Sequence, residues 1–143
     1  NLRSLEELYL SYNNLEGQVP TSLARLSKLR LPGLSLNSLS GEFPPPLYNL
    51  SSLELISFSF NNFSGNLRFD FGNYFPNLLI LYLEKCQFIG SILSSLANAS
   101  KLLELDFPIN NFTGNIPEGS ITCGICCFGV TNLDTVSMMA LTL

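Results

Sequence analysis

Residues 2–20 read LRSLEELYLSYNNLEGQVP, and leucines stand at positions 2, 5, 8, 10 and 15 of this stretch. The same offsets return four more times along the chain. The residue at the position of Asn13 recurs at residues 37, 61, 86 and 110, so the period is 24 or 25 residues. A fixed period of this length predicts a repeat architecture, in which each unit buries its apolar face against the next unit. Residues 1–117 hold five such units.

Each offset has a physical reason. Leu8 and Leu10 alternate with polar residues, which predicts a short strand whose leucines point into the coil. Stacked coils then form a parallel sheet. An asparagine amide can pair with backbone groups that a tight bend leaves unsatisfied. We therefore expect a structural asparagine ladder made of Asn13, Asn37, Asn61 and Asn110.

Other repeat positions indicate turns and local irregularities. Glycines at 17, 41, 65, 90 and 114 permit backbone conformations that a Cβ would obstruct. Pro32 replaces a strand leucine and cannot donate a hydrogen bond, so we expect the second strand to be weak or to start one residue later. Cys86 takes the asparagine position of the fourth repeat.

The stretches Ser38-Leu-Ser-Gly-Glu-Phe-Pro44 and Asn110-Asn-Phe-Thr-Gly-Asn-Ile-Pro117 follow the pattern LxxLxxLxLxxNxLxGxIP. This pattern resembles the leucine-rich repeats in the ectodomains of plant receptor-like serine/threonine kinases. The resemblance covers residues 1–117 and implies an α/β repeat solenoid: a right-handed superhelix with a concave parallel β-sheet and an irregular or 3-10 convex side. Residues 118–143 form a degenerate tail, in which Leu133, Val136 and Met139 restore the spacing and predict a truncated sixth repeat.

The resemblance also implies a location and a division of labour. We expect a chain on the extracellular side of the plasma membrane, in the apoplast, with any kinase activity in a separate downstream domain. Asn1 to Glu7 is already repeat sequence, so we expect the chain to start inside a longer protein and to reach the membrane only through another segment.

Composition excludes several classes of function. Only 13% of residues are charged, and the net charge of -4 argues against a nucleic-acid partner, which needs clustered Lys or Arg. The chain has no histidine, the commonest general base and metal ligand. We therefore predict no catalytic residue, no metal site and no cofactor.

Three short motifs suggest other chemistry. Asp70-Phe71-Gly72 spells the metal-binding triplet of protein kinases, but no Gly-rich loop precedes it and no His-Arg-Asp loop exists. Residues 124–131 have phosphate-loop spacing, yet Val130 stands where a lysine is required. The cluster Cys123, Cys126 and Cys127 could form part of a disulfide framework, half of a zinc site, a redox pair or unpaired thiols. The extracellular setting favours the disulfide.

The sequence contains four Asn-x-Ser/Thr sequons, which can carry glycan on an exposed surface of a secreted chain. These predicted glycosylation sites are Asn49, Asn62, Asn98 and Asn111. Asn62 and Asn111 directly follow a ladder asparagine and should share one flank. Asn49 and Asn98 precede the first leucine of a repeat and should lie on the convex side.

Residues between the inward leucines should face the concave side and form columns across the strands. One column, Tyr12, Leu36, Phe60, Lys85 and Ile109, is mainly apolar although it should be exposed, and exposed aromatic residues in a row mark interaction surfaces. Acidic residues add charge that favours a basic ligand. The predicted ligand-binding residues are Tyr9, Tyr12, Phe60, Tyr82, Glu84 and Asp106.

We therefore expect a receptor segment that recognises a peptide or protein ligand on the concave face, together with a co-receptor, in defence or developmental signalling. Two alternatives stay open. One is a secreted leucine-rich repeat protein similar to the polygalacturonase inhibitors. The other is a scaffold segment with no ligand of its own.

Overall fold

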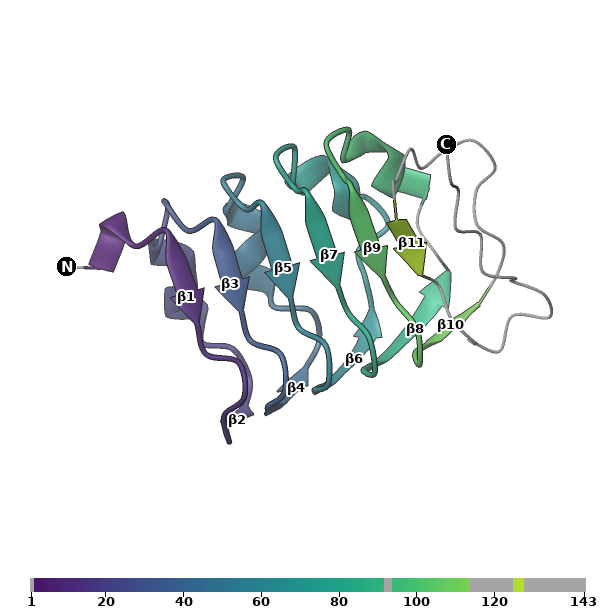
Figure 1. Ribbon diagram of the computed structural model, residues 1–143, viewed down its shortest axis with the longest axis horizontal. Helices are drawn as coiled ribbons and strands as arrows, with labels where there is room; N and C mark the ends of the chain where they lie inside the picture. The colour runs from purple at the N-terminus through teal and green to yellow at the C-terminus, as the bar shows by residue number, and fades with distance from the viewer. Residues whose placement is uncertain (1, 92–93, 114–124, 128–143) are drawn as a thin grey trace.

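The computed structural model describes residues 2–91, 94–113 and 125–127. The described chain winds through successive coils, each built from a strand, a turn, a second strand and a short 3-10 helix (Figure 1). Strands at the same position in successive coils pair in parallel, so the expected repeat solenoid with a parallel sheet is confirmed. No helix in the described part of the chain has the length and apolar character needed to cross a bilayer.

The larger sheet, here called sheet 1, carries the strands that the leucine spacing predicts. Its register joins Glu7 to Leu31 and Tyr82 to Asp106, as expected from residues one repeat apart. A sixth strand pairs with the fifth at the C-terminal end. Residues 133–141, where the spacing predicts a further repeat, lie outside the described residues. The strands of sheet 1 are β1 (Glu7–Tyr9), β3 (Leu31–Gly33), β5 (Leu55–Ser57), β7 (Ile80–Tyr82), β9 (Glu104–Asp106) and β11 (Ile125–Cys127).

A second parallel sheet, sheet 2, follows the asparagine turns and was not predicted from the sequence. Phe63, Phe88 and Phe112 point inward from its strands and are almost fully buried. Their rings stack from coil to coil with centroids 6.4 and 6.3 Å apart and interplanar angles of 10° and 14°. The strands of sheet 2 are β2 (Glu16–Gly17), β4 (Ser38–Gly41), β6 (Asn62–Asn66), β8 (Gln87–Ser91) and β10 (Asn111–Thr113).

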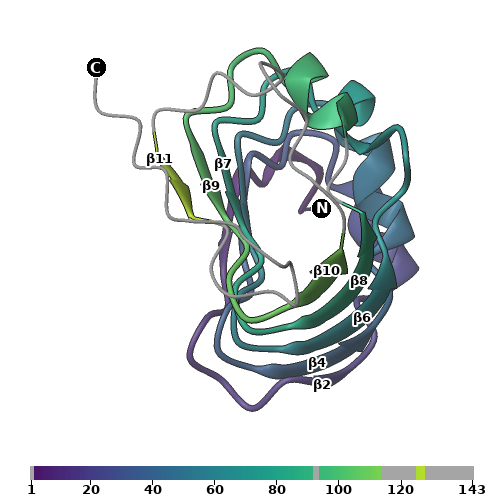
Figure 2. The same cartoon turned by 90° about the vertical axis from the view of Figure 1, so that its right-hand side faces the viewer.

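Short 3-10 helices close the third side of the solenoid, as expected for the convex side (Figure 2). A coil needs only a tight turn here, and 3-10 helices are used in short pieces of this kind. The 3-10 helices are η1 (Leu2–Ser4), η2 (Thr21–Arg25), η3 (Pro45–Asn49), η4 (Phe71–Tyr74) and η5 (Ser94–Asn98).

The residues of the Asp70-Phe71-Gly72 triplet lie at the start of η4 and have structural roles. The Phe71 side chain is fully buried and packs edge-on against Phe43, with ring centroids 5.0 Å apart. A Cβ on Gly72 would come within 1.9 Å of the Ser95 carbonyl oxygen, so only glycine allows η4 and η5 to approach this closely. Asp70 bonds to Arg68 and Tyr74. The triplet therefore serves packing between coils.

Pro32 does not delay its strand, and the expectation of a later start is wrong. β3 begins at Leu31 and pairs with β1 over three residues. On the other side, the register between β3 and β5 includes only Gly33 and Ser57. In the next coil, the backbone N–H of an inward-facing residue donates a hydrogen bond to a carbonyl oxygen of the following coil, as that of Phe58 does to Tyr82. Pro32 lacks an N–H group, so the weakened pairing falls on the β5 side alone.

Candidate functional site on the outer face of sheet 1

Five residues just beyond the sheet 1 strands share an uncommon backbone conformation. Their φ angles lie between 49° and 59°, in the left-handed region that residues other than glycine and asparagine seldom adopt. They form the left-handed column: Tyr12, Leu36, Phe60, Lys85 and Ile109. Tyr12 is 81% exposed and Ile109 is 56% exposed. The column that the sequence predicts to be apolar and exposed to solvent therefore lies on turns with a strained backbone.

Asparagines follow three members of this column and fix the turn in their coils, whereas Asn13 in the first coil is exposed and bonds only within its own coil. Asn61 is buried, and its Nδ2 donates to the carbonyl oxygens of Leu34 and Phe58 at 3.0 and 2.9 Å. Its Oδ1 accepts from the Leu39 N–H at 3.0 Å. Asn37 and Asn110 make the equivalent bonds in their own coils. Each amide thus ties two coils together beneath the left-handed residue.

Cys86 interrupts the ladder. Its thiol is buried and lies 3.5 Å from the Phe58 carbonyl oxygen. Burial raises the pKa of this thiol to about 11, so it stays protonated at neutral pH. A protonated buried thiol is a weak substitute for an amide and a poor nucleophile.

At the N-terminal end of the outer face, the last residue of β1, Tyr9, has an exposed side chain. It is 66% exposed and its ring lies beside Gly33, where a Cβ would meet the Tyr9 Cδ1 at 3.5 Å. A Cβ at residue 33 would therefore make an ordinary van der Waals contact with the Tyr9 ring, which packs over the backbone of the next strand. Ser35 and Ser57 share a hydrogen bond of 2.7 Å in the next coils, so the centre of the face is lined by small hydroxyl groups.

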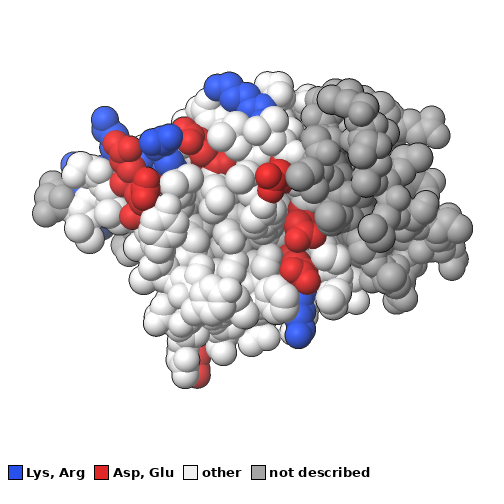
Figure 3. Space-filling model, in the orientation of Figure 1, with Lys and Arg blue, Asp and Glu red and all other residues white. Residues whose placement is uncertain are grey.

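The C-terminal end of the same face is acidic, and its carboxylates form a short red column over the last strands of sheet 1 (Figure 3). The Tyr82 hydroxyl donates to the Glu104 carboxylate. Burial raises the pKa of the Asp106 carboxyl, and the neighbouring Glu84 carboxylate raises it further. Asp106 Oδ1 is buried without a hydrogen-bond partner among the described residues. A carboxylate in this setting costs free energy that a cationic partner would offset.

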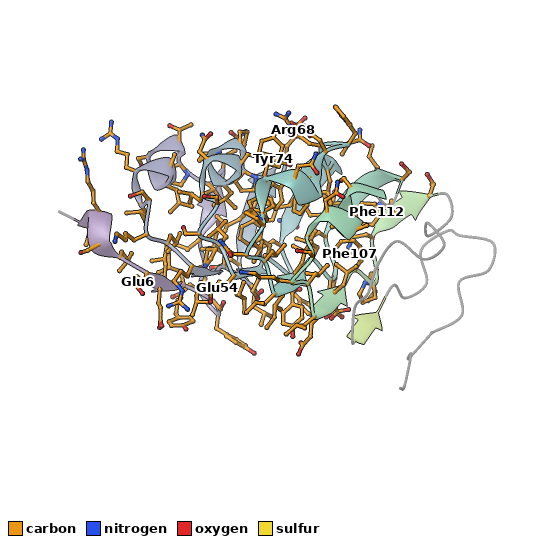
Figure 4. The ribbon with its side chains drawn as sticks, turned by 90° about the horizontal axis from the view of Figure 1, so that it is seen from above. Glu6, Glu54, Arg68, Tyr74, Phe107 and Phe112 are labelled. Carbon is orange, nitrogen blue, oxygen red and sulfur yellow. The ribbon has the colours of Figure 1, made fainter. Side chains whose placement is uncertain are left out.

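The edge where the sheet 1 strands begin carries a charged cluster. Arg30 forms two bonds to Glu54, at 2.9 and 2.7 Å, and one to Glu6 at 3.3 Å (Figure 4 labels both glutamates). The Arg30 guanidinium lowers the pKa of Glu54. Because these side chains are partly exposed, the cluster contributes modestly to stability and chiefly aligns the first three coils.

A second cluster, of Arg68 with two tyrosines and an aspartate beside η4, was not predicted from the sequence. Arg68 stands where the repeat usually has proline, and its guanidinium lies 4.8 Å from the Tyr74 ring centroid and 5.4 Å from that of Tyr48 (Figure 4). It also pairs with Asp70 at 3.1 Å. The only sequence signal was the departure from proline, which does not reveal that two tyrosines from adjacent coils flank the cation.

The structure places four of the six predicted ligand-binding residues on this face: Tyr82, Glu84 and Asp106 lie near one another at the C-terminal end, and Tyr9 lies three strands away in β1. Tyr12 and Phe60 belong to the left-handed column at its edge. Phe60 also lines a pocket of about 410 Å³ on the turn toward sheet 2. Ligand binding by any of these residues remains a prediction.

All four sequon asparagines are exposed. Asn49 and Asn98 end η3 and η5, whereas Asn62 and Asn111 begin β6 and β10. Their glycosylation remains a prediction. Cys123 lies outside the described residues, and only the backbone of Cys126 and Cys127 is described, so the fate of the three thiols stays open. Within the described ranges, no group of His, Cys, Asp and Glu side chains is arranged to hold a metal ion.

Comparison with known proteins agrees with this architecture. The family described as "Leucine Rich Repeat" matches residues 4–26. A comparison with curated proteins gave no significant match. Among solved structures, a TDR receptor is similar to this chain with a TM-score of 0.86 and 32% identity, over 92% of this chain and 23% of that chain.

Two further structures show how widely this solenoid is used. The Arabidopsis receptor kinase HAESA, solved with the peptide hormone IDA and the co-receptor SERK1, is 34% identical, with a TM-score of 0.74 over 81% of this chain and 19% of that chain. A plant ice-binding protein is 28% identical, with a TM-score of 0.76 over 92% of this chain and 43% of that chain. The chain thus spans less than a quarter of the length of either receptor chain. Residues 4–26 thus match the leucine-rich repeat family, and the described part of the chain has the leucine-rich repeat solenoid fold of these plant receptor ectodomains.

Proposed function

We propose that the outer face of sheet 1 binds a peptide or a segment of a protein, as part of a receptor on the extracellular side of the plasma membrane. The observation that carries the proposal is the alignment of an exposed tyrosine platform with unsatisfied negative charge. Tyr9 lies at one end of the face, and Tyr82, Glu84 and Asp106 lie at the other. Tyrosines of this kind are enriched among binding hot spots.

We expect charge to determine which end of the ligand lies at the C-terminal end of the face. The carboxylates at the C-terminal end of the face favour a lysine, an arginine or a free amino terminus. Asp106 supplies the strongest reason, because its buried oxygen has no hydrogen-bond partner among the described residues and its raised pKa reports a carboxylate that is poorly solvated. A ligand cation beside this carboxylate would offset the cost of its burial through charge attraction.

The positions of the sequons support the same surface. Each of them lies on the 3-10 side or on sheet 2, and the outer face of sheet 1 has none. Glycans at these positions would leave the proposed binding face uncovered. The bulk of the solenoid could be glycosylated without blocking a ligand.

The finer parts of the proposal rest on similarity. HAESA was solved with a peptide hormone and a co-receptor, and RGFR1, another similar structure, is a plant peptide hormone receptor. By analogy, the protein that contains this chain signals in defence or development through a peptide or protein ligand and a co-receptor.

Peptide selection tests the proposal. The full chain, secreted from insect cells, is used to select binders from a random peptide library displayed on phage. We expect the selected peptides to be rich in Lys and Arg. Tyr82→Ala and Asp106→Asn should each weaken their binding by about 10-fold or more, which corresponds to roughly 1.4 kcal/mol.

Ile89→Ala is the matched control, because Ile89 is 46% exposed on sheet 2, away from the proposed face. It should leave the affinity unchanged. The proposal fails if neither sheet 1 variant changes the affinity, or if the selected peptides are acidic.

A further inference from the structure

A polar pocket with one aromatic wall lies on the turn that joins sheet 1 to sheet 2. Its volume is about 410 Å³. Phe60 forms the aromatic wall, and Asn62, the sequon asparagine at the start of β6, lies beside it. The remaining lining residues are Asn37, Ser38, Asn61, Lys85, Cys86 and Gln87.

The backbone explains why Phe60 and Asn62 reach one pocket. Phe60 has a φ of 58°, and the chain then enters the extended strand β6 at Asn62. Between them, Asn61 turns inward and is held by its hydrogen bonds to Leu34 and Phe58. Phe60 and the exposed Asn62, two residues later, thereby line the same pocket.

We propose that a glycan attached to Asn62 seats its first N-acetylglucosamine in this pocket, against the ring of Phe60. The inference rests on the proposed function only in requiring a secreted chain. Attachment forms a bond between Asn62 Nδ2 and C1 of the sugar. It breaks the bond between C1 and the diphosphate of a lipid-linked oligosaccharide donor, and the amide gives up one proton.

The pocket offers what this sugar needs. An aromatic face carries partial negative charge, which attracts the polarised C–H groups of a pyranose ring and of an acetamide methyl. Gln87 and Ser38 line the same pocket and provide polar partners for the acetamide and the hydroxyls. The Lys85 ammonium makes a cation–π contact with the Phe60 ring, 5.3 Å from the ring centroid, so a seated sugar would share the ring with this exposed lysine and could accept a hydrogen bond from it.

At the other sequons, Asn49, Asn98 and Asn111, the residue two positions before the asparagine is aliphatic: Leu47, Leu96 or Ile109. Asn111 begins β10 in the way that Asn62 begins β6, but the residue two positions before it is Ile109, which has no aromatic face. The amide nitrogen of Asn98 donates to Asn73 Oδ1 at 2.7 Å and lies on the 3-10 side. The chain thus contains its own comparison, with one aromatic and one aliphatic residue at equivalent sites.

This inference gives Phe60 a task other than peptide binding. Phe60 lies at the edge of sheet 1, whereas Tyr82 and Asp106 lie within its strands. A glycan in the pocket would cover the flank of the solenoid and leave the outer face open.

The test uses the full chain, secreted from insect cells grown with N-acetylglucosamine that is ¹³C-labelled in the acetyl methyl group. Glycopeptide mass spectrometry first measures occupancy at each sequon. The NMR spectrum of the native protein should then show one acetyl methyl signal shifted upfield by an aromatic ring, with a nuclear Overhauser effect to phenylalanine ring protons. Phe60→Leu and Asn62→Gln should each abolish that signal, and Ile109→Leu should preserve it.

Three results would overturn the inference: an unmodified Asn62, no upfield-shifted acetyl signal in the wild-type protein, or a shifted signal that survives Asn62→Gln. The wild-type spectrum decides the matter even if Phe60→Leu fails to fold. The outcome is separate from that for the proposed function, because peptide affinity is measured on the outer face of sheet 1. A sugar signal without peptide binding, or the reverse, identifies which of the two ideas is wrong.

Discussion

At the scale of single residues, Asn61 and Asn62 are neighbours with opposite roles. Asn61 is buried and bonds to backbone groups of two coils, whereas Asn62 is exposed at the start of a strand. Asn61→Ala leaves several buried backbone groups unpaired and should lower the free energy of unfolding by about 1–3 kcal/mol. Urea denaturation of unglycosylated protein measures this change. Asn62→Gln should be close to neutral, and equal losses from both variants would contradict the register.

The left-handed column carries strain that can be measured. Ile109 is β-branched and has a φ of 55°, a conformation that costs roughly 1–2 kcal/mol and that asparagine tolerates better. Ile109→Asn in unglycosylated protein should therefore raise the melting temperature. The control is Ile89→Asn, an exposed isoleucine within strand β8, where asparagine is disfavoured and the melting temperature should fall. A fall in both variants would show that the column is unstrained.

Asp106 combines a predicted binding role with a cost in stability. Its pKa is raised in the folded chain, so the folded state holds the proton more tightly than the unfolded state. The contribution of this group to stability is therefore greatest at acid pH and declines as the pH rises through its raised pKa. Asp106→Asn should raise the melting temperature at pH 7, and the gain should shrink toward pH 3. A gain that is constant with pH, or a loss at pH 7, would contradict this account.

At the scale of elements, the junction between β3 and β5 is the weak contact in sheet 1. Pro32 removes one hydrogen bond there, and the ion pair of Arg30 with Glu54 bridges the same two coils but is partly exposed. The amides of Leu34 and Phe58 donate equivalent bonds, at 2.8 and 2.9 Å, to Ser57 and Tyr82. Leu34 donates across the weak contact and Phe58 donates across the next one.

Native-state hydrogen exchange measures the difference. The Leu34 amide should exchange at least about ten-fold faster than the Phe58 amide, because the first two coils can open before the rest of the solenoid. Pro32→Val restores the missing donor and should narrow the gap. Equal protection of the two amides in the wild-type protein would show that the proline costs nothing.

The same scale shows what the sequence could predict. The register of sheet 1 followed from leucines at a fixed period, because each buried position repeats in every coil. The strands of sheet 2 could not be predicted, because strands such as Ser38–Gly41 contain glycine and small polar residues that are typical of turns. The left-handed φ of Tyr12 and Phe60 was also hidden, because aromatic residues seldom adopt it. In the candidate site, the shared face was predictable, whereas the buried unpaired oxygen of Asp106 depends on packing.

At the scale of the whole molecule, the solenoid presents three surfaces with different chemistry. Sheet 1 carries tyrosines and carboxylates. Sheet 2 carries mainly small polar side chains beside two sequons, with Glu16 and Ile89 as exceptions, and the 3-10 side carries the other two sequons. The stacked coils hold these surfaces in fixed relation, because buried leucines and phenylalanines join each coil to the next. We expect ligands to bind to the outer face of sheet 1 only.

Engineered glycans test that claim directly. Ser57→Asn creates the sequon Asn-Phe58-Ser59 in the middle of the outer face of sheet 1, and Ile89→Asn creates Asn-Gly90-Ser91 on sheet 2. Both variants are secreted from insect cells, their occupancy is confirmed by mass spectrometry, and the affinity for the library-selected peptides is measured by surface plasmon resonance. A glycan at residue 57 should abolish binding, and one at residue 89 should leave the affinity unchanged. Full binding with residue 57 glycosylated, or loss of binding only with residue 89 glycosylated, would contradict the account.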